Sequence, residues 1–136
     1  MANRCKVTAQ TLITFGGLKV EGQDEASFEI ARSGDITIKG ELKVNGVTKS
    51  QIRVKFAGEG IVQLERDVVV KNAVLDLSKK DLKLEESASV TARGKALIVI
   101  KAGTDISRWS IGRDAGVLRG WELVRGSEEV GSAREG

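Results

Sequence analysis

Apolar and polar residues alternate over much of the first hundred positions of the chain. Between residues 35 and 44 the even-numbered positions are aliphatic apart from Gly40, and the odd-numbered positions are Asp, Thr, Lys and Glu. Successive side chains of a strand point to opposite faces, so this pattern predicts strands with one face in a core and one in solvent. The same alternation recurs at residues 11–15, 18–20, 27–31, 52–56, 82–84 and 88–92.

Two segments, Val68–Val70 and Ala96–Ile100, break the alternation because every residue in them is apolar. Continuous apolar runs are typical of strands that are covered on both faces. A domain of 136 residues has room for few such strands. Either the two segments are central strands of a two-layer fold, or another subunit covers their outer faces.

One predicted hairpin joins residues 75–77 to residues 82–84. The leucines at the two ends of each segment share one face if the four-residue loop Ser78–Asp81 connects them. Within that loop, Lys79 and Lys80 are expected to lie in solvent.

The Asn45-Gly46 dipeptide is normally a strong signal for a two-residue hairpin turn. Here that register would place Leu42 opposite Lys49 and so mix the apolar and polar faces. A bulge or a five-residue loop would restore the faces. The other option is that no hairpin forms and short strands stack in parallel, as in a solenoid.

These patterns predict an all-β single domain, an antiparallel β-sandwich or jelly roll with a C-terminal extension. A short β-solenoid or a small β-barrel is the alternative. Solenoids usually show a repeat of fixed period. We detect no such repeat in this sequence, which favours the sandwich.

The character of the chain changes after Ile106. All twelve lysines lie in residues 1–101, whereas residues 102–136 contain five arginines, both tryptophans and no lysine. Arg and Trp are enriched where proteins bury surface against partners. After Gly116 the apolar residues fit both helical spacing and strand alternation, and the glycines disfavour a helix.

We therefore divide the chain into three parts. Residues 1–106 form a β-rich body, residues 107–125 form a Trp/Arg contact segment, and residues 126–136 form a flexible tail. The contact segment either folds back onto the monomer's own core or docks on a neighbouring subunit.

The residue types needed for most catalytic and metal chemistry are scarce. The chain contains no His, the usual general base near neutral pH and the commonest metal ligand. Its single cysteine, Cys5, can form neither an intrachain disulfide nor a thiolate metal cluster. Glu85 and Glu86 would point to opposite faces of a strand, so they do not form a carboxylate pair for glycoside chemistry. We expect no enzymatic activity, no catalytic or metal-binding residue and no cofactor.

A stripe of basic residues on the alternating outer face raises the question of nucleic-acid binding. Its members are Lys39, Lys43, Lys49, Arg53 and Lys55. Asp35 and Glu41 interrupt the stripe, and it has no aromatic side chain on which bases could stack. Phe28 and Phe56 are interpreted as core residues. We do not expect nucleic acid to be the main partner.

No segment predicts insertion into a membrane. The longest apolar run, Ala96–Ile100, is far shorter than the roughly 20 residues that cross a bilayer. The first residues lack the apolar stretch of a secretory signal. A lone cysteine fits a reducing compartment. These features predict a location in the cytoplasm or within a particle.

The function predicted from the sequence is structural. We expect a non-enzymatic β-rich subunit that assembles with copies of itself into a homo-oligomer, shell, tube, filament or virion-like particle. The alternatives are a small ligand- or carbohydrate-binding sandwich and a weak single-stranded nucleic-acid-binding barrel. The residues predicted to form the oligomer interface are Trp109, Trp121, Arg108, Arg113, Arg119, Arg125, Val69, Leu97 and Val99.

Overall fold

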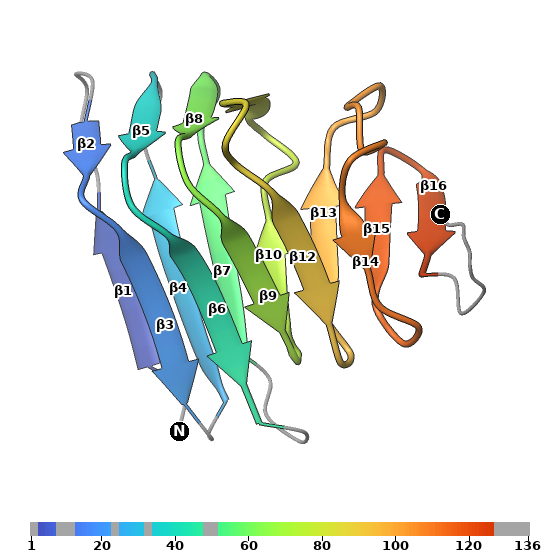
Figure 1. The fold of residues 1–136 in the computed structure, drawn as a ribbon. Coiled ribbons are helices and arrows are strands. Elements are labelled where there is room, and N and C mark those ends of the chain that lie inside the picture. The colour runs from blue at the N-terminus through green and yellow to red at the C-terminus, as the bar shows by residue number, and fades with distance from the viewer. Residues whose placement is uncertain (1–2, 8–12, 23–24, 32–33, 48–51, 127–136) are drawn as a thin grey trace.

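The chain winds into a stack of short strands, which Figure 1 shows with the N-terminal coil at the left and the C-terminal strands at the right. This computed structural model describes residues 3–7, 13–22, 25–31, 34–47 and 52–126. Every regular element within those ranges is a β-strand. The all-β prediction is confirmed.

The strands form three sheets of unequal size. In spatial order, sheet A contains β1 (Asn3–Val7), β4 (Ala26–Ala31), β7 (Ile52–Ala57), β10 (Ala73–Asp76), β13 (Leu97–Ile100), β15 (Gly116–Arg119) and β16 (Glu122–Arg125). Sheet B contains β11 (Asp81–Leu84), β8 (Ile61–Leu64), β5 (Ile36–Ile38) and β2 (Ile13–Phe15). Sheet C contains β14 (Ser110–Ile111), β12 (Val90–Arg93), β9 (Val68–Lys71), β6 (Leu42–Gly46) and β3 (Leu18–Gly22).

The architecture is a parallel β-solenoid. Each coil contributes one strand to sheet A, then one to sheet B, then one to sheet C, and the next coil repeats this path one strand further along. Four coils of this kind, from β1–β3 to β10–β12, are complete in the described ranges. In Figure 1 sheet C lies in front of sheet A, and sheet B runs along the top. The pair β15 and β16 is antiparallel and ends the stack.

The predicted antiparallel sandwich is therefore wrong, and the stated solenoid alternative is correct. Alternation reports that one face of each strand is buried, and it does so equally for parallel and antiparallel pairing. A repeat of fixed period is missing because the coils differ in length. Ile52 lies beside Ala26, 26 positions earlier, whereas Gly116 lies beside Leu97, 19 positions earlier.

The predicted hairpin between residues 75–77 and 82–84 is also wrong. Strand β10 pairs in parallel with β7 and β13, and β11 pairs in parallel with β8 in a different sheet. The loop between them turns a corner from sheet A to sheet B. Likewise Gly46 ends β6 in sheet C, and the chain then passes to β7 in sheet A. For Asn45-Gly46, parallel stacking without a hairpin is the arrangement found.

The core lies inside the coils and is built from stacked aliphatic columns. On sheet C, Leu42, Val68 and Val90 lie in one column and are almost completely buried. Phe56 on sheet A is the largest fully buried side chain, at 0% exposure. Phe28, one coil earlier, is partly buried against the same cluster. Both phenylalanines were expected to be core residues, and the structure places both there.

A buried lysine closes the corner between sheets A and B. Lys80 is 0% exposed, and its ammonium group donates hydrogen bonds to the carbonyl oxygens of Gly34 at 3.2 Å and Glu59 at 3.1 Å. These carbonyls belong to the two preceding coils, so one side chain ties three coils together. The prediction of a solvated loop tip holds for Lys79 and is wrong for Lys80. Burying an amino group is costly unless it is hydrogen-bonded, and these two backbone acceptors offset part of that cost.

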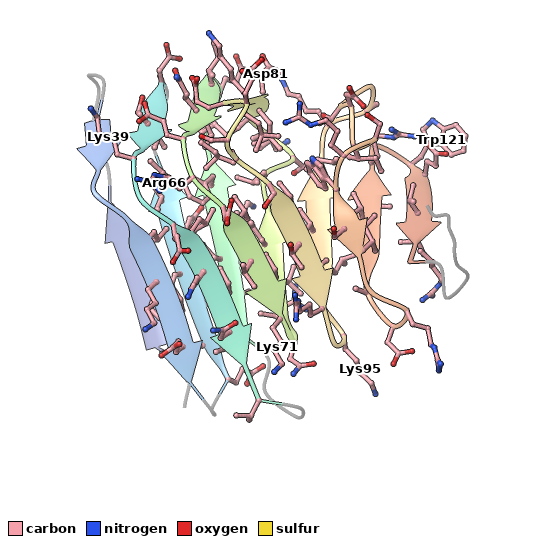
Figure 2. The ribbon with its side chains drawn as sticks, in the orientation of Figure 1. Lys39, Arg66, Lys71, Asp81, Lys95 and Trp121 are labelled. Atoms are coloured by element: carbon pink, nitrogen blue, oxygen red, sulfur yellow. The ribbon has the colours of Figure 1, made fainter. Side chains whose placement is uncertain are left out.

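The corner between sheets C and A is fixed by an asparagine. Asn72 adopts a left-handed backbone conformation with φ of 51°. Its side chain donates to the carbonyl oxygen of Gly46 in the coil before and accepts from the backbone N–H of Lys95 in the coil after. Asn is among the few residues with a side chain that adopt this conformation readily. Lys71 and Lys95 mark this lower corner in Figure 2.

Candidate functional site

The outer face of sheet A changes from polar to apolar along the stack. On β4 and β7 the outward side chains are Ser27, Glu29, Arg53 and Lys55. On β10, β13, β15 and β16 they are mostly aliphatic. We call this second group the apolar face, and its members are Val74, Leu97, Val99, Leu118 and Leu123.

Strand register makes the apolar face continuous. Val74 lies beside Leu97 on one level, and Val99, Leu118 and Leu123 follow one another on the next level. Gly116 continues the first level beside Leu97 and contributes no side chain to it. A methyl group placed there would meet Leu123 at 3.3 Å and Leu97 at 3.8 Å, so these two leucines close over the glycine.

The apolar face is only partly covered within one chain. Leu123 is 49% exposed, and the other four residues are half-buried. The residues that alternate with them, such as Ile98 and Val117, are almost fully buried in the core. The continuous apolar run Ala96–Ile100 is thus one strand with a buried face and a half-exposed apolar face.

Charged residues border the apolar face on both sides, and at the β10 border Asp76 lies beside Lys55 of β7. Asp76 on β10 lies beside Val99 at one border, and Arg125 on β16 lies beside Gly116 at the other. Trp121 occupies the turn between β15 and β16, close to Leu118 and Leu123 in the chain, and is 90% exposed. Figure 2 shows its side chain projecting beyond the end of the stack.

The nine residues predicted for an oligomer interface are spread over several surfaces. Leu97 and Val99 lie on the apolar face, and Arg125 and Trp121 lie at its border. Val69 is half-buried on the outer face of sheet C, between Lys43 and Thr91. Three members of the apolar face were not predicted, namely Val74, Leu118 and Leu123. Leu118 and Leu123 are an odd number of positions apart, so strand alternation alone does not place them on one face, and their neighbours depend on the turn before β16 and on the 19-residue offset between β13 and β15.

Of the remaining predicted residues, three lie near the C-terminal end of sheet B, and Arg113 lies in the turn from sheet C to sheet A. Trp109 packs against the core, and Arg108 donates to the carbonyl oxygen of Glu86 at 3.4 Å. Arg119 forms an ion pair with Glu122 at 2.9 Å and donates to the carbonyl oxygen of Thr104 at 3.0 Å. Arg113 is exposed in the turn that precedes β15. Strand β14 in segment 107–125 continues sheet C, and strands β15 and β16 continue sheet A.

A cleft of about 470 Å³ lies where sheet B ends, between β11 and the loop of residues 101–109. We call it the C-terminal cleft. Its walls include Leu82 and Leu84 of β11, Ala88 and Val90, and the loop residues Lys101, Asp105, Arg108 and Trp109. Lys101 forms an ion pair with Asp81 across one end at 3.1 Å.

The loop that borders the C-terminal cleft is held by a local turn at Asp105. The Asp105 carboxylate accepts a hydrogen bond from the backbone N–H of Ser107 at 2.9 Å. This bond, followed by the Ser107 hydroxyl and the nearby Arg108 and Arg119, lowers the pKa of Asp105. A lowered pKa means that the turn is strengthened at neutral pH and loses this support as the pH falls through the folded-state pKa.

The basic residues considered for nucleic-acid binding do not form one stripe. Lys43 points outward from sheet C and pairs with Glu41 at 3.4 Å. Arg53 and Lys55 point outward from sheet A, on another side of the solenoid. Lys39 lies after β5, and Lys49 lies outside the described residues. The solenoid path separates residues that a sandwich strand order would have aligned.

Within the described ranges, no group of three or more His, Cys, Asp or Glu side chains is placed to hold a metal ion. The same ranges contain no helix of the length and hydropathy that crossing a membrane requires. The side chain of Cys5 and the predicted tail lie outside what the structure describes, apart from Gly126.

No family model, curated protein or solved structure matches this chain. Its function is therefore inferred from its own residues.

Proposed function

We propose that this protein is a non-enzymatic structural subunit whose copies associate through the apolar face of sheet A. The observation that carries the proposal is the row of aliphatic side chains pointing outward on four neighbouring strands. Single exposed apolar residues are ordinary on protein surfaces, but contiguous apolar patches are associated with interaction sites. Here the five residues are adjacent by strand register.

A second copy of the chain is the partner that the face fits best. Flat sheet faces pack on each other at about 10 Å. A two-fold axis parallel to the strands would reverse the strand order across the contact. Asp76 of one copy would then lie near Arg125 of the other, and these two side chains are opposite in charge. Trp121 would lie at the end of the contact, where it can reach the other copy.

The size of the apolar face sets the expected strength of association. Its four strands span roughly 15–20 Å across and roughly 13 Å along the strands. Two such faces bury less than the roughly 800 Å² per partner of a standard stable interface. We therefore expect reversible, concentration-dependent association, which larger assemblies would strengthen through repeated contacts.

Substitution of Val99 by glutamine tests the proposal. Val99 is half-buried in one chain, so its remaining exposed surface is what a partner would cover. A two-fold dimer contains the substitution twice. We expect it to reduce the free energy of association by about 2 kcal/mol, which is a roughly 30-fold higher dissociation constant. Sedimentation equilibrium over a range of concentrations measures this constant.

Val69→Gln is the matched control because Val69 is also an outward-facing, half-buried valine, on sheet C. We expect it to leave association unchanged. Trp121→Ala should weaken association without lowering the free energy of unfolding, because the indole is 90% exposed. Equal weakening by Val99→Gln and Val69→Gln, or a wild-type chain of 14.6 kDa at every concentration, would refute the proposal.

A further inference from the structure

The three sheets end at different points along the stack. Within the residues that the structure describes, sheet A has seven strands, sheet C has five and sheet B has four. After β13 the chain does not add a fifth strand to sheet B but crosses to β14 through the loop of residues 101–109. The C-terminal cleft lies beside β11, on the side where the next sheet B strand would otherwise lie.

Strand β11 presents unpaired backbone groups to this cleft. The N–H groups of Asp81 and Glu85 donate to Gly60 and Leu64 on the β8 side. In a parallel ladder the bonding direction alternates from residue to residue, so Leu82 and Leu84 direct their N–H and C=O groups away from β8. Within the described ranges no residue pairs with these two positions on the open side.

The hydrophobic core is also open at this point. Val62 and Leu64 of β8 are at most 1% exposed, whereas Leu82 and Leu84, their neighbours in the same columns, are only half-buried. The inward side chains of one further strand would cover the exposed parts of Leu82 and Leu84. Trp109 and Ala88 supply apolar surface on the other walls of the cleft.

From this geometry we infer that the C-terminal cleft binds an extended peptide, which adds to the free edge of β11 as a fifth strand of sheet B. Addition of a strand to an open sheet edge is an established mode of peptide recognition, in which backbone hydrogen bonds supply affinity and alternate side chains supply specificity. The peptide would pair with the backbone of Leu82 and Leu84. It would carry aliphatic residues at alternate positions to cover these two side chains.

The flat end of a second solenoid does not fit this edge. Sheet A extends three strands beyond sheet B, which corresponds to roughly 14 Å at the usual strand spacing. The first strands of all three sheets, β1, β2 and β3, belong to one coil, so they form a flush end. The flush end of a second solenoid would contact strand β16 before it could reach β11. A single extended segment can enter the recess.

The probe is a capped peptide with the sequence of residues 60–66, Gly-Ile-Val-Gln-Leu-Glu-Arg, because β8 is the strand that β11 already pairs with. Backbone amide hydrogen exchange with and without this peptide, at concentrations up to the millimolar range, is the measurement. We expect exchange to slow at least tenfold at Leu82 and Leu84 and to stay unchanged at Lys83, whose N–H already faces β8.

Two controls separate backbone pairing from nonspecific contact. A peptide with N-methyl groups at alternate residues cannot donate to the edge, and we expect at least tenfold weaker binding. Leu84→Pro removes one donor of the edge without removing a bond to β8, and it should bind at least tenfold more weakly than Leu84→Ala. If Leu84→Pro does not fold, the methylated peptide still decides the matter.

Three results with added peptide would overturn the inference. They are no protection at Leu82 and Leu84 at millimolar peptide, equal binding of the methylated peptide, or protection of Lys83 together with its neighbours. Deletion of residues 127–136 tests the chain's own C-terminal segment as the occupant. Loss of protection at Leu82 and Leu84 in the deleted chain without added peptide would also overturn it. None of these results bears on the apolar face of sheet A, so the two proposals fail separately.

Discussion

Replacing Phe56 with alanine is expected to lower the free energy of unfolding by about 3–5 kcal/mol. Phe56 is 0% exposed. It lies on sheet A beside Ile30 of the preceding coil, and its side chain points into the interior that all three sheets share. Its removal would leave a cavity that close-packed columns on either side cannot fill without shifting strands. Urea unfolding followed by circular dichroism measures the loss.

Phe28→Ala is the matched control for this prediction. Phe28 belongs to the same sheet, one coil earlier, but it is only partly buried. We expect a distinctly smaller loss of stability, because part of its ring is already in contact with solvent. Equal losses for the two variants would show that the core is not centred where the structure places it.

Replacing Gly60 with alanine is expected to cost roughly 2–4 kcal/mol of stability. Gly60 has φ of +133°, a region that residues with a side chain rarely adopt, and an added methyl group would collide with the carbonyl group of Gly34 in the preceding coil. The same corner contains the hydrogen bond from Asp81 N–H to the Gly60 carbonyl oxygen. Thermal unfolding of the variant measures the cost.

Gly103→Ala separates backbone strain from the collision. Gly103 also has a positive φ, of +86°, but a methyl group there would meet nothing within 4 Å. We expect this variant to lose only about 1 kcal/mol. If Gly60→Ala were no more destabilising than Gly103→Ala, the tight stacking of the coils at this corner would be wrong.

Strand positions and facing were predictable from this sequence, whereas strand pairing was not. Alternation located the buried residues Ile36, Ile38, Leu42 and Val44 because each strand has one face in the core. Pairing depends on how the chain turns at the corners. The loop after β10 turns into another sheet, and there the Lys80 side chain is held inside by carbonyl groups of two earlier coils, which no local sequence pattern reveals.

The candidate interface was predictable only in part. The continuous run Ala96–Ile100 identified Leu97 and Val99 as apolar residues that the core would not use. Their neighbours Leu118 and Leu123 are far along the chain or across a turn, and only the register of β13, β15 and β16 brings them together. The C-terminal cleft could not be predicted, because it results from a strand that the last coil omits.

The two proposed binding surfaces differ in kind: one is a sheet face and the other is a strand edge. The apolar face would join copies through side chains on sheet A, whereas the free edge of β11 would bind a peptide through its backbone. The surfaces belong to different sheets, so both can be occupied at once. A subunit of this kind would assemble and still hold a segment of another chain.

Intermolecular nuclear Overhauser effects test the association through sheet A most directly. A mixture of methyl-labelled and unlabelled protein would show which methyl groups contact protons of another copy. We predict such contacts at Leu97, Val99, Leu118 and Leu123 and none at Val69. Contacts at Val69 instead, or none at any of these methyl groups in a concentrated sample, would contradict association through the apolar face.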